Sequence, residues 1–417
     1  MSAERKVVVT GIGPVTPVGV GVDEFWRGLT SGQNGIRPIS RFDTSELPVK
    51  LAGDVDGFDP GGWLDAKEIR RTDRFVHYAV AAAKLAWQDA GAVDVRADRG
   101  GVVFATGIGG IEWLLQQHSV LLERGPGRVS PFMVPALMAN AAAGHIAMQL
   151  GLTGPNFCTV SACASGAHAV GEGYRMVRDG LLDAAIVGGA EAATLPLTVA
   201  AFAQMQALTK NPDPETASRP FDAERDGFVL SEGACALILE TEERASARGA
   251  RVYAEIAGYG ASDDAYHITA PDPKGSGAAL AIGRALDDAG EEPAAIDYVN
   301  AHGTSTPLND ASETRALKSA LGEDVAHVVA ISSTKSMTGH MLGAAGAVEA
   351  AVCAMAIHTG VAPPTIHYRT PDPDCDLDCV PNEARELNVR LAISNSFGFG
   401  GQNAVVALRR AAVTPTA

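Results

Sequence analysis

Short runs of β-branched residues that end in glycine turns alternate along this chain with long alanine-rich segments. Residues 6–13 (KVVVTGIG) and 183–191 (DAAIVGGAE) are typical of buried strands that end in tight turns. Residues 73–91 (DRFVHYAVAAAKLAWQDAG) predict a helix that Gly91 closes. Strands that alternate with helices in this way form a layered α/β structure. Two further runs of the strand type are 100–110 and 233–240.

The same alternation starts again after the middle of the chain. A new strand is predicted from Val252, and residues 296–306 and 391–401 again show a strand that runs into a glycine or His-Gly turn. A chain of 417 residues with 46% hydrophobic content can bury the core of two domains. No low-complexity linker interrupts it, so we expect two similar halves, 1–250 and 251–417, in one rigid body. We expect only the tail, 411–417, to be disordered.

The charge and the cysteines exclude several classes of function. A formal net charge of −16 argues against general binding to nucleic acid or to a membrane surface, because these polyanions would be repelled. No secretion signal is visible, and we expect no apolar run to reach the roughly 18 residues of a membrane span. Six cysteines in so long a chain do not form a disulfide framework and indicate a reducing cytoplasm. Cys375 and Cys379 lack the further ligands of a metal site, and the glycine turns lack the spacing of a nucleotide-binding loop.

Two cysteines lie five residues apart in the stretch FCTVSACASG. Residues 156–161 alternate as a strand, and from Ala164 onward the sequence is helical, so Cys163 lies on a turn from strand to helix. A helix N-terminus stabilises a thiolate and can bind an oxyanion, which makes Cys163 a candidate nucleophile. Cys158 is predicted to lie inside the strand as a buried thiol. For both cysteines the alternative is simple packing in the core.

Other candidate residues follow strands in the second half. His302 and His340 each lie where a strand ends, the edge at which α/β sheets place their sites. Lys335 would need a nearby carboxylate unless it is solvated, and Glu349 on the following helix could supply it. Phe399 lies in a glycine-rich turn that can move and bring N–H groups close to a ligand.

The chain resembles a known family in five motifs that occur in the same order. They are VSACASG, ASRPFDAERDGFVLSEGA, AHGTSTPLND, STKSMTGHMLGAAGAVEA and SNSFGFGG. Together they look like the elongating β-ketoacyl-[acyl carrier protein] synthases of type II systems, and the resemblance covers nearly all of residues 5–410.

The resemblance implies a thiolase-like fold, with two pseudo-equivalent βαβαβαβ halves stacked as five layers in a dimer. Cys163 matches the nucleophile and His302 and His340 the paired histidines, while Lys335 and Glu349 match a supporting ion pair and Phe399 a mobile gate. The family condenses malonyl-carrier protein with an acyl group held on the cysteine. It needs no metal or organic cofactor, because the carrier protein brings the prosthetic arm. Four positions match the acyl pocket: Ile108, Thr198, Phe202 and Leu342.

An acidic carrier protein needs a basic landing site on an enzyme of charge −16. Lys67, Arg70, Arg71 and Arg74 are spaced to line one face of a predicted helix and correspond to the docking region of the family. An ordinary solvated helix face is the alternative.

Departures from the commonest pattern leave the acyl chain open. Gln402, Thr198 and Met133 stand where the fatty-acid enzymes usually carry other residues. A ketosynthase subunit of a type II polyketide synthase, paired with a chain-length factor instead of a second copy, therefore stays an alternative. A non-catalytic partner subunit is a more distant one, because Cys163 would be missing from it.

Overall fold

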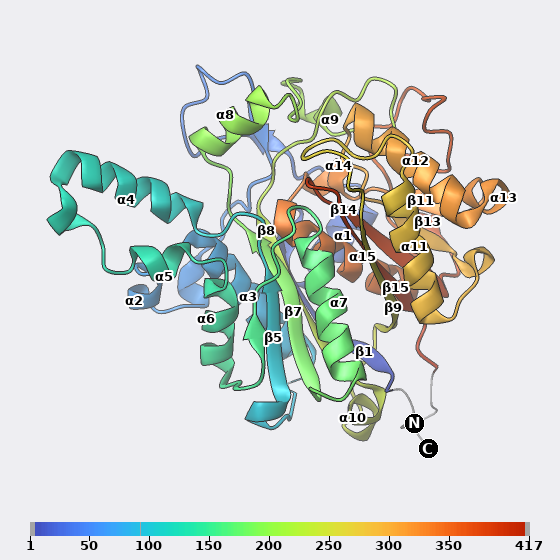
Figure 1. Ribbon diagram of the computed structural model, residues 1–417, viewed down its shortest axis with the longest axis horizontal. Coiled ribbons are helices and arrows are strands. Elements are labelled where there is room, and N and C mark those ends of the chain that lie inside the picture. Colours follow the sequence, from blue (N-terminus) through green and yellow to red (C-terminus); the bar gives the residue numbers. More distant parts are fainter. Residues whose placement is uncertain (1–4, 92, 413–417) are drawn as a thin grey trace.

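Two groups of five strands with the same order and the same directions form the frame of the protein (Figure 1). The computed structural model describes residues 5–91 and 93–412, so most of the tail expected to be disordered, 413–417, lies outside the described residues. The first group has the order β6-β5-β7-β8-β1 and the second the order β11-β10-β14-β15-β9. In each group the first three strands are parallel and the last two pair antiparallel.

The two groups join edge to edge, because β1 and β9 pair over three residues of each strand. The ten strands are β1 (Val7–Thr16), β5 (Gly100–Ala105), β6 (Asn156–Phe157), β7 (Ala184–Glu191), β8 (Gly233–Thr241), β9 (Ala254–Asp263), β10 (Tyr298–Asn300), β11 (Ala330–Ser332), β14 (Leu391–Phe397) and β15 (Gln402–Arg409). Short strands outside this order are β2 (Gly19–Val20), β3 (Arg37–Pro38), β4 (Leu51–Ala52), β12 (Val361–Ala362) and β13 (Arg385–Glu386).

Helices cover both groups of strands and fill the space between them. Helices α7 and α15 pack on each other and on strands of both groups, α3 and α6 cover the outer face of the first group, and α11 with α12 covers that of the second. These are the five layers that the resemblance implied. The six helices are α3 (Arg74–Asp89), α6 (Ala141–Leu150), α7 (Ser165–Arg178), α11 (Ser276–Ala289), α12 (Pro307–Leu321) and α15 (Ala345–Thr359).

Smaller helices lie mainly in the connections and at the periphery. Helix α4 has no buried residue and extends away from the body of the protein on the left of Figure 1. These helices are α1 (Val22–Thr30), α2 (Ala66–Ile69), α4 (Ile111–Arg124), α5 (Met133–Leu137), α8 (Pro196–Gln204), α9 (Pro214–Ala217), α10 (Glu242–Ala247), α13 (Glu323–Ala326) and α14 (Lys335–Thr338).

Glycines on β1 and β9 let the outer helices pack directly on the backbone of the strands. A Cβ atom on Gly11 would lie 2.2 Å from the carbonyl oxygen of Ala86 in α3. In the second half, a Cβ atom on Gly260 would lie 2.1 Å from the carbonyl oxygen of Ala281 in α11. Both halves therefore use the same contact between a glycine and an alanine-rich helix, which explains why these helices contain so much alanine.

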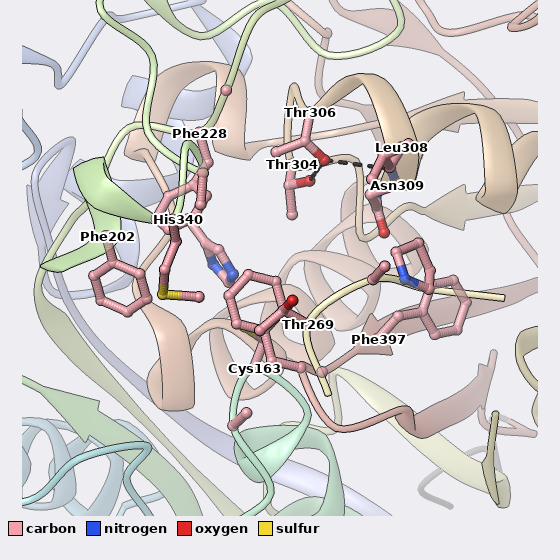
Figure 2. A pocket seen from close by; sticks show the side chains of 18 of the residues that line it. Cys163, Phe202, Phe228, Thr269, Thr304, Thr306, Leu308, Asn309, His340 and Phe397 are labelled. Atoms are coloured by element: carbon pink, nitrogen blue, oxygen red, sulfur yellow. Dashed lines mark hydrogen bonds between the residues drawn. The ribbon is translucent and has the colours of Figure 1, made fainter. Parts of the chain in front are cut away.

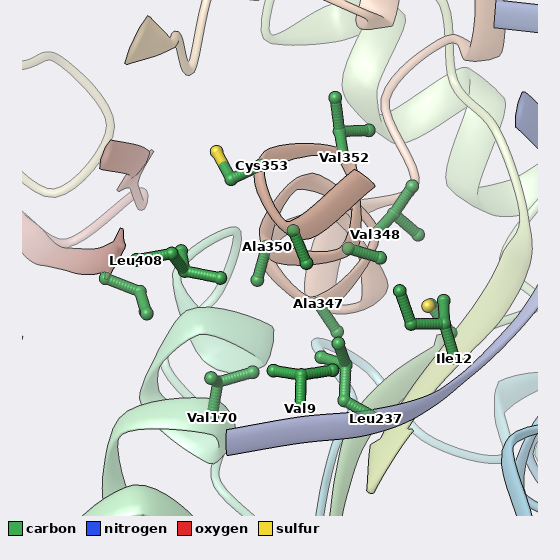
Figure 3. Close-up of a cluster of buried hydrophobic side chains, with 14 of the residues drawn as sticks. Val9, Ile12, Val170, Leu237, Ala347, Val348, Ala350, Val352, Cys353 and Leu408 are labelled. Atoms are coloured by element: carbon green, nitrogen blue, oxygen red, sulfur yellow. The ribbon is translucent and has the colours of Figure 1, made fainter. Parts of the chain in front are cut away.

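Helix α15 is surrounded by core side chains, among them Val170 of α7, Leu237 of β8 and Leu408 of β15 (Figure 3). With the turn before it, it forms an apolar segment of 18 residues, Leu342–Thr359, that is long and apolar enough to cross a membrane. The expectation that no apolar run reaches this length is therefore wrong. Of this segment, 89% is buried inside the protein, and a helix between two layers of strands is apolar on all sides for that reason.

The strand predicted over residues 156–161 is shorter than expected. Strand β6 covers Asn156–Phe157, and Cys158 follows it in a half-buried position outside any strand. The strand predicted from the alternating pattern is confirmed for its first two residues. The chain then leaves β5 and approaches the turn that carries Cys163.

Candidate active site

The N-terminal ends of α7 and α15 meet at two glycines in the centre of the protein. A Cβ atom on Gly166 would lie 2.7 Å from the backbone nitrogen of Ala347, and one on Gly346 would lie 2.5 Å from that of Ala167. Cys163 precedes α7 by two residues and lies on the strand-to-helix turn that the sequence predicted, next to Ala162 with its positive φ of 49°. This close crossing brings the segment of Cys163 to the segment that precedes α15.

Three side chains from distant parts of the chain converge at this crossing. One sulfur or nitrogen ligand atom each of Cys163, His302 and His340 lies within 4.8 Å of the other two. The imidazole rings of the two histidines meet edge to face with centroids 5.3 Å apart. Within the described residues this is the only group of three histidine, cysteine or acidic side chains close enough to share a metal ion, and Cys375 and Cys379 belong to no such group.

Lys335 lies directly beside the two histidines. Its ammonium group donates a hydrogen bond of 2.6 Å to the carbonyl oxygen of His302, lies 3.5 Å from Nδ1 of that ring and forms an ion pair with Glu349. The side chains of this ion pair are only 2–3% exposed. A positive charge at this place disfavours a divalent metal ion on His302 and instead suits a neutral imidazole.

Burial and this charge set the protonation of the site. Burial and the nearby ammonium group lower the pKa of His302 and His340 well below the ordinary range, so both imidazoles are neutral at physiological pH. Both ring nitrogens of His340 lack a hydrogen-bond partner among the described residues. Burial also raises the pKa of Glu349 to about 7, although its ion pair with Lys335 opposes the shift.

The expected stabilisation of a Cys163 thiolate is not what the structure shows. Burial raises the pKa of this thiol to about 11, and the opposing effects of the Lys335 charge and of a hydrogen bond from the backbone N–H of Phe399 are smaller. Burial likewise raises the pKa of Cys158 to about 11. The two cysteines therefore differ in position and not in acidity, because Cys163 alone of the two faces the histidines.

A cavity of about 580 Å³ opens onto these side chains, and Figure 2 labels Cys163 and His340 among the residues that line it. Three of the four predicted pocket residues line it, namely Ile108, Phe202 and Leu342, and Phe399 lines it as well. Thr198 is not among the residues that line it. Its hydroxyl group is bonded within its own helix turn, where it donates to the carbonyl oxygen of Leu195 at 3.0 Å.

The structure also shows polar groups in and near the cavity that sequence reasoning did not single out. Thr304 and Thr306 line it, and their hydroxyl groups are 2.9 Å apart (Figure 2). Glu313 was also missed: its carboxylate accepts hydrogen bonds from the backbone N–H groups of His302 at 2.8 Å and Gly303 at 2.7 Å. The sequence shows Glu313 only as an acidic residue on a helix that also contains alanine and leucine, and this pattern does not by itself indicate that the carboxylate is buried.

The four predicted docking residues do not lie on one helix. The chain leaves the helical path after α2, and the buried side chain of Asp73 caps the start of α3. Arg74 pairs at 2.8 Å with Glu232 and is only 16% exposed, so it is not a docking residue. Lys67, Arg70 and Arg71 are exposed.

The chain matches family models along most of its length. Residues 4–245 match the model described as "Beta-ketoacyl synthase, N-terminal domain", and residues 253–369 match "Beta-ketoacyl synthase, C-terminal domain". The chain is 52% identical over 410 residues to 3-oxoacyl-[acyl-carrier-protein] synthase 2 of Synechocystis sp., with 98% of both chains covered. It is 48% identical to the protein of the same name from Coxiella burnetii, over 98% of this chain and 99% of that one.

Solved structures resemble the whole chain as well. The ishigamide ketosynthase/chain length factor has a TM-score of 0.92 and 40% identity, with 98% of this chain and 100% of that chain covered. A β-ketoacyl synthase from Burkholderia phymatum has a TM-score of 0.90 and 38% identity over the same shares. A ketosynthase of a type II polyketide synthase, solved with its acyl-carrier protein and bound to the hexaketide, has a TM-score of 0.89 and 34% identity, also over these shares.

Proposed function

We propose, from the premise that this chain belongs to the β-ketoacyl synthase family, that it elongates acyl chains held on an acyl carrier protein. Cys163 accepts the acyl group as a thioester, and His302 and His340 assist the condensation of that group with malonyl-carrier protein. One observation carries this proposal: a cysteine and two neutral histidines meet within 4.8 Å in the lining of a cavity.

In the first half-reaction, the sulfur of Cys163 attacks the carbonyl carbon of the acyl thioester. The thiol is protonated at rest because its pKa is about 11, so a neutral imidazole of the pair must accept the proton as the C–S bond forms. His340 is suited to this because no other group occupies its ring nitrogens in the described residues. The backbone N–H of Phe399, which points at the sulfur, can also stabilise the oxyanion. The proton then leaves with the thiol of the carrier's arm.

In the second half-reaction, malonyl-carrier protein loses CO₂ and leaves an enolate with its charge on the thioester oxygen. Two neutral imidazoles can each donate an N–H to that oxygen, and the Lys335 ammonium beside Nδ1 of His302 leaves Nε2 of that ring to carry the proton. The enolate carbon attacks the acyl-cysteine, a C–C bond forms, and the C–S bond to Cys163 breaks. The thiolate released from Cys163 then takes up a proton from water, which restores the resting thiol. The β-ketoacyl thioester is two carbons longer. Decarboxylation itself supplies the carbanion, so we expect no metal and no cofactor of the enzyme's own.

The carrier protein is expected to dock on Lys67, Arg70 and Arg71. Their exposure supports this, as does the need of an acidic partner for a local basic patch on a chain of charge −16. The guanidinium group of Arg71 lies 4.3 Å from the ring centroid of Phe132, which helps to hold this side chain in place.

We propose that the protein forms a homodimer and that the open edge of the first group of strands is its interface. Among the described strands, β6 pairs only with β5 there, and exposed apolar side chains lie on it and near it, including Phe157, Val160 and Met148 of α6. A row of unpaired backbone groups beside apolar side chains favours pairing with a second chain.

We take the enzyme to work in the cytoplasm, where a reducing medium keeps Cys163 a free thiol. The repeated strand order supports 1–250 and 251–417 as its two pseudo-equivalent halves.

A ketosynthase subunit of a type II polyketide synthase is the second candidate. The similarity to the ishigamide ketosynthase/chain length factor favours it. A chain-length factor would then occupy the edge at β6 instead of a second copy. A non-catalytic partner subunit is disfavoured, because Cys163 and both histidines are present.

Mass spectrometry of the intact protein after mixing with acyl-carrier proteins tests the proposal. We expect the wild type and the matched control Cys158→Ala to gain the mass of one acyl group, and Cys163→Ala to gain none. A fully acylated Cys163→Ala variant would contradict the assignment. Native mass spectrometry of the same samples distinguishes a homodimer from a monomer that needs a different partner.

A further inference from the structure

The carboxylate of Glu191 is buried at the end of β7, and no cationic side chain of the described residues pairs with it. Its side chain is inaccessible to solvent, and it forms no ion pair with a described residue. Four donors satisfy it instead. Oε1 accepts from the hydroxyl of Thr106 at 2.9 Å and the N–H of Ile108 at 3.2 Å, and Oε2 accepts from the N–H groups of Gly107 at 2.7 Å and Gly343 at 3.0 Å. Burial raises the pKa of Glu191, and these hydrogen bonds oppose the shift.

These hydrogen bonds tie together two loops that belong to different halves of the chain. Gly107 lies in the loop after β5, and Gly343 lies in the short turn between His340 and α15. The loops are already in contact, because a Cβ atom on Gly343 would lie 2.1 Å from the backbone nitrogen of Gly107. The backbones therefore cannot approach further, and the shared carboxylate keeps them from separating.

Each loop carries one apolar side chain of the cavity. Ile108 follows Gly107 and Leu342 precedes Gly343, and both line the cavity together with Cys163. All three belong to one apolar cluster. Ile108 and Leu342 form two walls of the cavity. The position of each wall is fixed by a hydrogen bond that Glu191 accepts from a backbone N–H, that of Ile108 itself and that of Gly343 next to Leu342.

We propose that Glu191 is the positioning residue that sets the spacing of Ile108 and Leu342 and thereby limits the acyl chains that fit on Cys163. This inference rests on the proposed acyl transfer and adds the group that determines its substrate range. Glu191 does not touch the acyl chain, since it does not line the cavity. It acts through the two loops.

Glu191→Gln tests this with little change of shape. The amide has one acceptor and one NH₂ group, and every partner of the carboxylate donates a hydrogen bond. Whichever way the amide turns, its NH₂ opposes the N–H of Ile108 or those of Gly107 and Gly343, so one wall of the cavity loses its anchor. An apolar pocket discriminates by about tenfold or more for each methylene group that it admits or rejects.

The experiment measures the rate of acyl transfer to Cys163 from carrier proteins with a graded series of acyl chains. We expect Glu191→Gln to raise the ratio of long-chain to short-chain rates by about tenfold. The control is Glu255→Gln, which removes another buried glutamate, paired at 2.6 Å with Arg409, and should leave that ratio unchanged. If Glu191→Gln does not fold, Glu191→Asp is measured, because its shorter side chain cannot reach both loops.

Two outcomes would overturn the inference. One is a folded variant with the wild-type ratio, and the other is an equal loss of rate for all chains, which a purely structural role would give. The wild type in the same series separates this inference from the proposed function. If the wild type accepts no acyl group, the proposed function fails; if it does and the ratio does not move, only the role of Glu191 fails.

Discussion

Replacing Lys335 by methionine removes the positive charge of the buried ion pair between Lys335 and Glu349. Lys335 supplies the one ion pair that Glu349 forms among the described residues, and both side chains are buried. Methionine has a similar length and no charge, so the carboxyl group of Glu349 stays buried without a partner. We expect this variant to lose stability as the pH rises from 7 to 9, in a range where the wild type does not.

The size of the effect follows from the pKa of Glu349. Burial raises it from 4.5 to about 7 in the presence of Lys335, and removing the positive charge raises it further. The folded state then binds the proton more tightly than the unfolded state. Stability is therefore lost as the pH rises from about 4.5 to the folded pKa, by about 1.4 kcal/mol for each pH unit.

The loss stops near pH 7 in the wild type and continues in Lys335→Met, so the two curves diverge by about 3 kcal/mol at pH 9. This agrees with the cost of about 3–5 kcal/mol for breaking a buried ion pair on one side.

Urea denaturation at pH 6, 7, 8 and 9, at one protein concentration, measures the free energy of unfolding. In the double variant Lys335→Met/Glu349→Gln, no carboxyl group is left at position 349 to titrate, and we expect the divergence above pH 7 to disappear. Parallel curves for the wild type and Lys335→Met between pH 7 and 9 would refute the reasoning.

Three further predictions follow from the geometry. Changing Arg70 and Arg71 together to glutamate should raise the apparent KM for the acyl-carrier protein by about tenfold, because two attractive charges become repulsive. Alkylation of the nucleophilic cysteine should not change, and the control Arg390→Glu, directly before β14, should not alter the KM. An unchanged KM in the double variant would exclude this docking patch. His340→Ala should slow CO₂ release from malonyl-carrier protein by about 100-fold, since an enolate donor is lost; release within tenfold of the wild type would argue against that role. Gly346→Ala places a Cβ atom 2.5 Å from a backbone nitrogen of α7 and should cost about 1–3 kcal/mol in urea denaturation; wild-type stability would show that the helices can separate freely.

Much of the fold follows from local patterns in the sequence. The strand runs that end in glycine turns and the helix over 73–91 appear as β1, β5, β7, β8 and α3. The second half repeats the strand order of the first, and the repeated Gly-x-Gly of β1 and β9 could have been recognised as the same helix contact in both. Local patterns misled where the chain only partly follows them, as in the short strand before Cys158 and the break between α2 and α3.

The candidate site was predictable in its members but not in its electrostatics. The strand-to-helix turn and the family motifs pointed to Cys163, His302 and His340, and the structure brings these three together. The helix N-terminus predicted an acidic thiol, yet burial has the larger effect on its pKa. How deeply a side chain is buried depends on neighbours from the whole chain, so no local pattern reports it.

The sequence by itself determined the order of strands and helices, the turn that presents the nucleophile and the chemistry of the residues that assist it. These depend on periodicity and on residue type, which are local properties. Only the tertiary structure decided that Arg74 is held by Glu232 instead of facing a partner. It also decided that Glu191 joins the two walls of the cavity. Contacts between residues more than 80 positions apart depend on how the layers pack, and packing is a property of the whole folded chain.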